Sequence, residues 1–459
     1  MARGIRYGIA LTVLALLAMW LADHPGSVTL RWQNYRIDTS VGVLIAAVAA
    51  VAVMVALAYR AWLFVRYTPA RLRRVLHERR RRRGYKALSA GMVAVAAGDV
   101  DEARQQSRRA DVLVDDPPLT MLLQAQTAQL AGDEQAANTF FTAMLARPEM
   151  AFLGLRGLLT QALRQRDRAT ALDLARRAYR LQPRSAWVAG SLFDLQVGSG
   201  QWADAEATLD ESARARLLDA DTARRRRAVV EYMRGRAAEA AGDSEEALRR
   251  ARKANDLHPA FVPAAAWLAH LWHSRGKRSR ALKTVERTWA QAPHPDLLVA
   301  LRAAQSGGEP LQTVKAVQQL VAANPEHRES RLALAEAALD ARLWGEAREH
   351  LSQAGGGDPS AAICRLMARL EEEEHSNLEA ARAWLMQASR ADPDPAWCCG
   401  SCGSVVAAWV PVCAACDAFD SHAWRTPAHA TRLTAPTAPK ALTARPATHA
   451  QPLAKEAAG

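Results

Sequence analysis

Two features are scarce in this chain of 459 residues, and together they exclude one class of structure. Aromatic residues make up 6% of the chain, and runs of β-branched residues are nearly absent after residue 65. Because strands favour β-branched and aromatic residues, a large sheet is excluded. Alanine, leucine and arginine dominate instead, and they are good helix formers. The composition therefore predicts an all-α protein.

Acidic residues are scarce in one stretch, residues 60–86, which holds eleven Lys or Arg and a single acid, Glu78. This basic block carries +10 of the net charge of +13, so the rest of the chain is nearly neutral. The block directly follows an apolar segment, as is typical of the cytoplasmic flank of a membrane helix. Attraction to anionic lipid headgroups is compatible with that position. No nucleic-acid motif accompanies the block, so we expect no nucleic-acid partner.

Charge is absent from residues 41–59, which are long enough to nearly span a bilayer core. We predict two transmembrane helices, at about 5–22 and 41–62, joined by a short periplasmic loop within an anchor of residues 1–66. A cleaved signal peptide is the alternative for the first helix, but bulky side chains occupy the place of a cleavage site. A basic juxtamembrane segment follows over residues 67–84, which places both chain ends on the cytoplasmic side of a bacterial inner membrane.

A 34-residue period organises the middle of the chain. Short turns such as Gly98-Asp99 and Gly132-Asp133 are each followed, five residues after the turn begins, by a small residue. Glycine permits positive φ, aspartate caps the next helix, and the small residue lets two helices approach closely. The pattern resembles the tetratricopeptide repeat and predicts about nine helix pairs over residues 85–395. The alanines at this position are Ala103, Ala137, Ala171, Ala205, Ala247, Ala281, Ala347 and Ala381, with Thr313 taking their place in one unit.

One step of the period is 42 residues long, between Ala205 and Ala247, which predicts a longer helix pair there. The arginines of 224–227 lie in this step, and we expect them on a solvated helix face. His270 and His273 lie three residues apart and could ligate a metal or haem, although buried or capping histidines are commoner. No nucleophile elbow, phosphate loop, Rossmann fingerprint or zincin motif is present, so no enzymatic activity and no catalytic residue are predicted.

Five of the six cysteines cluster near the end of the chain. Cys399 and Cys402 form one C-x-x-C hook, and Cys413 and Cys416 form a second. Each hook can place two thiolates on one metal, and two hooks complete a tetrahedral site of four sulfurs. We predict a rubredoxin-like or zinc-ribbon-like knuckle over residues 396–426 that folds on metal binding.

Other chemistries of the cysteines are less compatible with their setting. Disulfides are disfavoured in the cytoplasm, and no βαβ unit supports a redox motif. Four thiolates suit both zinc and iron; we favour zinc because no redox partner is visible. Gly403 follows the first hook, where positive φ is needed, and Cys398 could replace Cys399 in a wider hook. The sixth cysteine, Cys364, is expected to be a core thiol. Residues 427–459 are rich in Ala, Thr and Pro and should be disordered.

The order of these parts resembles the HemY family of bacterial inner-membrane proteins. The stretches PLTMLLQAQTAQLAGD (118–133), FLGLRGLLTQAL (152–163), PHPDL (293–297) and WCCGSCG (397–403) are similar to its alphaproteobacterial form. The resemblance implies a membrane-anchored repeat protein associated with a late step of haem biosynthesis and without established enzymatic activity. The predicted function is a scaffold whose groove recruits protein partners, namely enzymes of the tetrapyrrole pathway.

A second family is more distantly similar, the lipopolysaccharide assembly protein B family. It also joins a membrane helix to cytoplasmic repeats and a four-cysteine module, and in it the module packs on the repeats. The present chain differs in having two predicted membrane helices and no proline in its second hook, VCAAC. This resemblance implies the alternative function, an adaptor that regulates envelope-lipid synthesis through a membrane protease. A haem or porphyrin carrier using the His270 and His273 pair is a third possibility.

Overall fold

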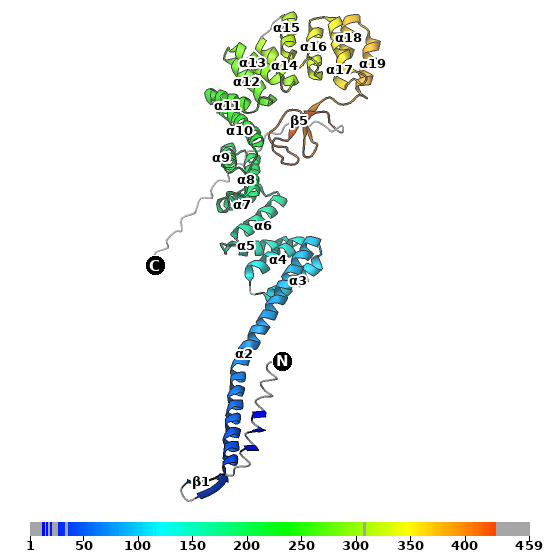
Figure 1. Cartoon of the computed structure of the whole chain (residues 1–459). Helices are drawn as coiled ribbons and strands as arrows, with labels where there is room; N and C mark the ends of the chain where they lie inside the picture. Colours follow the sequence, from blue (N-terminus) through cyan, green and yellow to red (C-terminus); the bar gives the residue numbers. More distant parts are fainter. Residues whose placement is uncertain are drawn as a thin grey trace, which may run out of the picture. The chain divides into compact units, whose positions relative to one another are not determined.

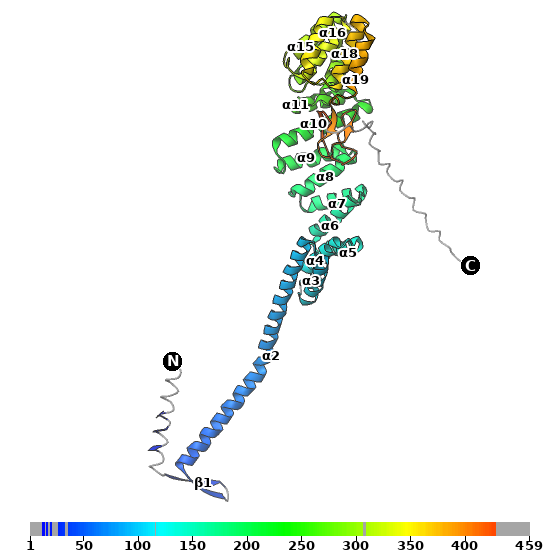
Figure 2. The ribbon, with the colours of Figure 1, turned by 90° about the vertical axis from the view of Figure 1, so that its right-hand side faces the viewer.

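The computed structural model describes residues 12–13, 15–16, 19–20, 26–32, 35–114, 116–305 and 309–427 (Figures 1 and 2). The chain divides into two compact units, Met1–Phe140 and Phe141–Gly459. Helices dominate both units, which confirms the predicted fold class. Most of the predicted first membrane helix and of the predicted tail lies outside the described residues, although the described residues 12–13, 15–16 and 19–20 are helical.

The first unit contains an antiparallel hairpin that the composition did not predict. It consists of β1 (Ser27–Trp32) and β2 (Tyr35–Ser40), and its register pairs Leu30 with Ile37. Apolar residues alternate along both strands, which is the period of a strand with two different faces. The predicted loop between the membrane helices is thus largely a hairpin.

A single helix, α2 (Val41–Ala97), joins the predicted membrane segment to the first repeat. Its residues Val41–Leu63 are long and apolar enough to cross a membrane, and apolar side chains such as Met54 are exposed along them. The helix continues without a break through the domain boundaries predicted after residues 66 and 84. Its end packs on the next helices, because Gly91 lies so close to Leu123 that a Cβ there would meet it at 2.7 Å.

Nine helix pairs follow one another along the described chain, beginning with the end of α2. The first helices of the pairs after α2 are α4 (Pro117–Leu130), α6 (Ala151–Arg164), α8 (Ala186–Gly198), α10 (Ala220–Ala240), α12 (Val262–Ser274), α14 (Pro295–Gln305), α16 (Arg328–Asp340) and α18 (Ala361–His375). The second helices are α3 (Val100–Leu113), α5 (Glu134–Leu145), α7 (Arg168–Leu181), α9 (Trp202–Arg214), α11 (Ser244–Leu257), α13 (Arg278–Trp289), α15 (Pro310–Val321), α17 (Trp344–Gly355) and α19 (Leu378–Ala388).

The predicted turn chemistry is confirmed at every repeat with an alanine at the key position. All eight turn residues have φ between 50° and 85°, although three of them are not glycine: Arg166, Arg342 and Ser376. Asp133 accepts a hydrogen bond from the Ala136 amide at 2.9 Å, and equivalent caps occur in four other turns. The eight alanines are at most 4% exposed, as close helix contact requires.

Two deviations from the period have structural counterparts. The 42-residue step corresponds to α10, which at 21 residues is longer than the 13 or 14 residues of its neighbours α9 and α11. Thr313, which takes the place of alanine in one unit, is only half-buried, and the adjacent Val314 is buried instead. The repeat is therefore maintained in this unit because a residue next to the usual alanine position is buried between the helices.

A small sheet follows the last helix. Strands β3 (Ala396–Cys399), β4 (Val405–Val406) and β5 (His422–Arg425) form an antiparallel sheet in the order β4-β3-β5. We call residues 396–425 the cysteine module. The module does not extend the array beyond α19; Figure 1 shows it turned back beside α8 and α10 within the second unit.

The alanine position gives a direct test of the packing argument. Ala205 and Ala207 are both in α9, but Ala205 is fully buried and Ala207 is exposed. We expect Ala205→Leu to lower the free energy of unfolding by about 1–3 kcal/mol through overpacking. Ala207→Leu should change it by less than about 0.5 kcal/mol. Denaturant unfolding followed by circular dichroism measures both, and equal effects would contradict the close-contact role.

Candidate metal centre and its position on the array

The structure brings four cysteine sulfurs together. The Sγ atoms of Cys399, Cys402, Cys413 and Cys416 all lie within 4.8 Å of one another. Cys399 is 3.6 Å from Cys416, and Cys402 is 3.7 Å from Cys413. Among the described residues this is the group of His, Cys, Asp and Glu side chains close enough to share an ion.

The two hooks have the same backbone geometry. Gly403 donates its amide to the Cys399 carbonyl at 3.0 Å, and Asp417 donates to the Cys413 carbonyl at 2.9 Å. Each of these residues lies four positions after the first cysteine of its hook, and each has positive φ, 75° for Gly403 and 60° for Asp417. Positive φ at Gly403 was predicted; at Asp417 it was not, because aspartate adopts it less readily than glycine.

The spacing of the sulfurs fits a tetrahedral metal. With metal–sulfur bonds of about 2.3 Å, two sulfurs at the corners of a tetrahedron lie about 3.8 Å apart. The observed 3.6 and 3.7 Å are close to that edge. A disulfide needs about 2.05 Å, so these thiols are not bonded to each other. The donor set of four thiolates selects a soft divalent ion such as zinc or iron.

The cysteine thiols differ in pKa because their burial and their hydrogen bonds differ. Burial raises the pKa of Cys399, but bonds from the Ser421 hydroxyl and from nearby backbone amides lower it to about 5. Hydrogen bonding by Ser404 lowers the pKa of Cys402. Burial and the neighbouring sulfurs raise the pKa of Cys416 to about 12. A cation is what would allow all four sulfurs to be thiolates at neutral pH, because like charges at this spacing oppose one another.

The remaining cysteines lie outside this group. Cys398 is in β3, is 2% exposed, and directs its Sγ to the Arg425 carbonyl at 3.4 Å. This contact accounts for its burial without a ligand role. Cys364 is fully buried in α18, as expected for a core thiol.

The amino-terminal region has known relatives. Residues 26–132 match the family described as HemY protein N-terminus. Over 121 residues the chain is 33% identical to Protein HemY of Escherichia coli strain K12, a stretch that covers 26% of this chain and 30% of that protein. The amino-terminal region of this chain is thus similar to HemY proteins.

The matched HemY region ends long before the cysteine module. A relative similar over most of the chain is the Probable magnetosome protein Mms48 of Magnetospirillum gryphiswaldense, 28% identical over 91% of this chain and 92% of that protein. Solved structures with some similarity include MamA, at 15% identity and TM-score 0.24 over 34% of this chain and 92% of that chain. A tetratricopeptide repeat protein from Parabacteroides merdae matches at 13% identity and TM-score 0.27 over 52% of this chain and 93% of that chain.

Aromatic side chains hold the cysteine module against α8, α10 and the start of α12. Trp409 lies 4.9 Å from the ring of Phe261 and 5.7 Å from that of Tyr232. Phe419 meets Phe193 of α8 edge to face at 5.1 Å. Such pairs stabilise by about 0.5–1.5 kcal/mol beyond the burial of their area. The module is therefore packed on the repeats.

Two tryptophans of the module enclose a buried histidine of the array. His294 is 2% exposed, and its ring centroid lies 5.0 Å from Trp397 and 4.3 Å from Trp424. Its Nδ1 accepts the Asp296 amide at 3.1 Å at the start of α14. Burial lowers the pKa of His294 to about 4, so the ring is neutral at pH 7.

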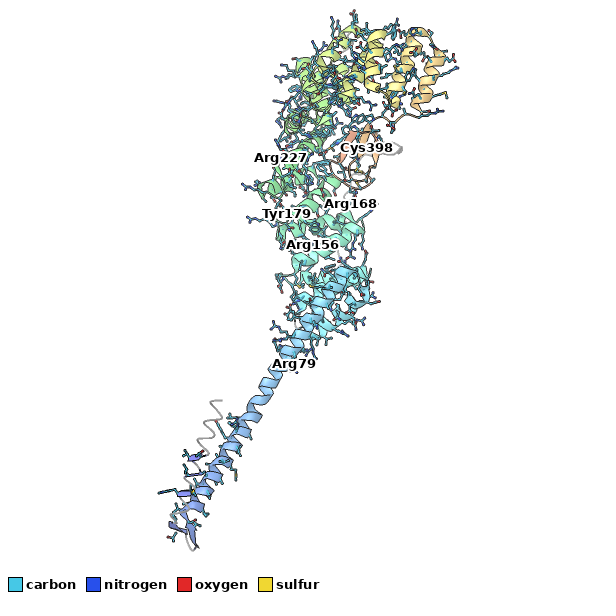
Figure 3. The ribbon with its side chains drawn as sticks, turned by 45° about the vertical axis from the view of Figure 1, so that its right-hand side comes forward. Arg79, Arg156, Arg168, Tyr179, Arg227 and Cys398 are labelled. Carbon is cyan, nitrogen blue, oxygen red and sulfur yellow. The ribbon has the colours of Figure 1, made fainter. Side chains whose placement is uncertain are left out.

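Charged groups add to the attachment. Arg168, which Figure 3 labels at the start of α7, forms an ion pair with Asp417 of the second hook. Burial raises the pKa of Asp420 to about 6, while Arg225 and Arg226 act to lower it.

The four arginines at 224–227, which were expected on a solvated helix face, differ in exposure: Arg224 and Arg225 are exposed, whereas Arg226 and Arg227 are half-buried. Arg226 lies over the Phe193 ring at 5.1 Å, and Arg227 pairs with Asp210.

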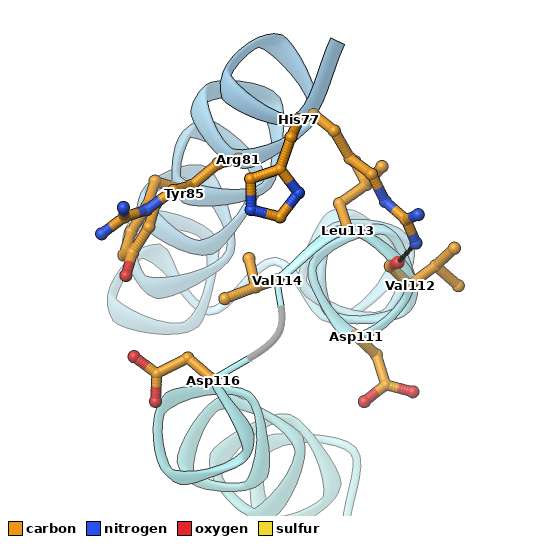
Figure 4. Close-up of a pocket in the computed structure, with 9 residues that line it drawn as sticks. His77, Arg81, Tyr85, Asp111, Val112, Leu113, Val114 and Asp116 are labelled. Carbon is orange, nitrogen blue, oxygen red and sulfur yellow. Dashed lines mark hydrogen bonds between the residues drawn. The ribbon is translucent and has the colours of Figure 1, made fainter. Parts of the chain in front are cut away.

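The predicted histidine pair lines a pocket at the edge of the module. This pocket of about 380 Å³ is bounded by His270 and His273 of α12, by Tyr232, and by Trp409 of the module. No third ligand joins the pair within the described residues. The first unit has a separate pocket of about 520 Å³, lined by His77 and Arg81 of α2 and by Asp111 and Asp116 (Figure 4).

Removal of one hook tests the metal centre. For Cys399→Ser combined with Cys402→Ser, we expect bound zinc or iron to be lost and the module to unfold, because a segment of about thirty residues has no core of its own. The helices of the array should persist, because each helix pair buries apolar side chains between its own two helices. Elemental analysis and circular dichroism measure the two effects. Cys398→Ser is the control that should retain the metal, and collapse of all helicity would show that the array depends on the module.

The buried histidine predicts a pH dependence. Because the pKa of His294 is about 4 in the folded state and 6.5 normally, the unfolded chain takes up a proton first as pH falls. Stability is complete above about pH 6.5 and decreases toward pH 4, by about 3 kcal/mol at most. His294→Asn keeps an acceptor for the Asp296 amide and removes the titration. Between pH 6.5 and 5, the melting midpoint of the module, followed by tryptophan fluorescence, should fall more steeply in the native chain; equal slopes would contradict this.

Proposed function

We propose that this chain, whose amino-terminal region is similar to HemY proteins, is a membrane-anchored scaffold that recruits enzymes of a late step of haem (protoheme) biosynthesis through protein–protein contacts, without catalysis of its own. The observation that carries the proposal is a pair of pockets, which we call the groove, where the array meets the cysteine module. Each pocket presents an apolar side chain to solvent: Leu163, 41% exposed, and Val299, 67% exposed. Exposed apolar side chains in a groove are typical of protein-binding surfaces.

The anchor supports the same proposal. The apolar span Val41–Leu63 is continuous with the first repeat through α2, so a partner bound to the array would be held near the bilayer. We propose a second membrane helix at about 5–22 and a cytoplasmic position for the array and the module, since the basic block follows the span. The chain would then be a multi-pass protein of the bacterial inner membrane.

The metal would have a structural role in this scaffold. We propose Cys399, Cys402, Cys413 and Cys416 as the ligands of zinc, because the four sulfurs have the spacing of a tetrahedral site. Zinc supplies no redox chemistry, and here it would hold the two hooks together. Trp409, Phe419 and Asp417 would then keep the folded module on the array.

One observation favours the alternative function. The module packs on the repeats, as in the lipopolysaccharide assembly protein B family, which the chain resembles more distantly. On this alternative the chain is an adaptor that presents an envelope-lipid enzyme to a membrane protease. The two functions differ in their partners and therefore can be separated by crosslinking.

A photo-crosslinking residue placed in the native host tests both functions. Positions Leu163 and Val299 probe the groove, and Leu311, 54% exposed on α15 and outside both pockets, is the control. We expect adducts with tetrapyrrole-pathway enzymes at the groove positions and none at Leu311. Adducts with a protease and its substrate would support the alternative. Normal haem and no accumulated porphyrin precursor in a deletion strain would refute the haem assignment.

A further inference from the structure

One of the two groove pockets is built jointly by the array and by the second cysteine hook. It has a volume of about 460 Å³ and lies where the hook meets α6, α7 and α8. Ala414 and Ala415, the two residues between Cys413 and Cys416, form one wall. Leu163 and Leu195 face the same space from the array. Larger residues between these two cysteines would occupy the pocket, so the Ala-Ala pair keeps it open.

The charged groups at the rim fall into two classes. Arg168 and Asp417 are paired with each other, and Asp167 caps α7 through the Thr170 amide at 3.1 Å. Arg166 and Asp194 also line the pocket, but neither side chain forms a hydrogen bond or ion pair with the described part of the chain. Desolvation of the carboxyl group raises the pKa of Asp194, and the positive charge of Arg226 acts in the opposite direction. The apolar part of the pocket is therefore flanked by one side-chain donor, Arg166, and one side-chain acceptor, Asp194, that are both available to a ligand.

The charged groups around the pocket restrict the kind of ligand that it can bind. Three carboxylates, of Asp167, Asp194 and Asp417, disfavour a small anion, and the guanidinium groups of Arg166 and Arg168 disfavour a small cation. A neutral, dipolar group with an apolar side chain satisfies both sides. Extended peptide has this character, because each residue offers one N–H donor and one carbonyl acceptor. Asp194 can accept the N–H, Arg166 can donate to the carbonyl, and Leu163 can contact the side chain.

We propose that this pocket binds an extended segment of a partner protein with an aliphatic side chain, and that the metal at the four cysteines controls this binding. The proposal rests on the proposed scaffold function and names one contact site for its partners. Since one wall is the second hook, loss of the metal would remove that wall together with the Arg168–Asp417 ion pair. By linkage, a bound peptide would in turn strengthen metal retention.

The test uses the full chain in lipid nanodiscs and a phage-displayed library of random heptapeptides. Peptides enriched on the native chain should share an aliphatic position, and labelled copies should bind in fluorescence anisotropy. We expect Ala415→Leu, which fills the pocket, and Leu163→Gln, which removes its apolar contact, to weaken binding at least tenfold. The matched control is Ala407→Leu, at an exposed alanine of the module that lines neither pocket, which should change affinity by less than twofold. Elemental analysis should show unchanged metal content in all three variants.

The metal dependence is measured on the same peptides. Binding should be lost after chelation and in the Cys399→Ser, Cys402→Ser double variant, and should return when zinc is restored to the chelated chain. Peptide affinity that is equal with and without metal, or equal in Ala415→Leu, would overturn the proposal. So would self-association through this pocket, or peptide binding that appears only after truncation at Pro427, because the occupant would then be a second copy or the chain's own tail. Crosslinks in cells at Val299 alone would contradict this site and leave the scaffold function standing.

Discussion

The structure depends on one steric constraint: two helices of a pair pack closely only where the side chain between them is no larger than alanine. In α9 and α11 this residue is Ala205 and Ala247, and both are fully buried. Close approach lets each pair bury its apolar stripe, and the next pair covers the opposite side. The array can therefore grow by repetition without a single large core, which a chain of this length could not otherwise form.

The continuity of α2 divides the basic block into two parts with different roles. If the apolar core of the bilayer ends near Leu63, Arg66 lies about 5 Å beyond it along the helix, whereas Arg79–Arg83 lie about 24–30 Å beyond it. The Debye length at physiological salt is about 8 Å, so lipid charge acts on the first part and is screened from the second. The second part has protein contacts instead: Arg80 donates to the Val112 carbonyl at 2.7 Å, and Arg82 pairs with Glu78 at 3.0 Å.

Local chemistry was predictable from the sequence, and long-range contacts were not. The positive-φ turns, the capping aspartates and the buried alanines follow from rules that act within a few residues, so the period revealed them. The convergence of Cys399, Cys402, Cys413 and Cys416 follows from the same kind of local rule, applied twice. The placement of the module on α8, α10 and the start of α12 depends on pairs such as Phe193 with Phe419, which are 226 residues apart in the sequence. No spacing rule connects such residues, and the hydrophobic pattern of Trp409 or Phe419 alone does not say which surface covers it.

The position of the module changes what kind of array this is. In a repeat array each pair contacts only its neighbours, so the curvature is set by small rotations that add up along the chain. The module adds contacts between pairs that are not neighbours, because it reaches Arg168 at the start of α7 and His294 before α14. Flexing of the intervening repeats would separate those two contacts. A metal bound at the four cysteines would keep the module folded and would therefore also restrain the curvature of the repeats between α7 and α14. An array of fixed curvature would lose less conformational entropy when a partner binds.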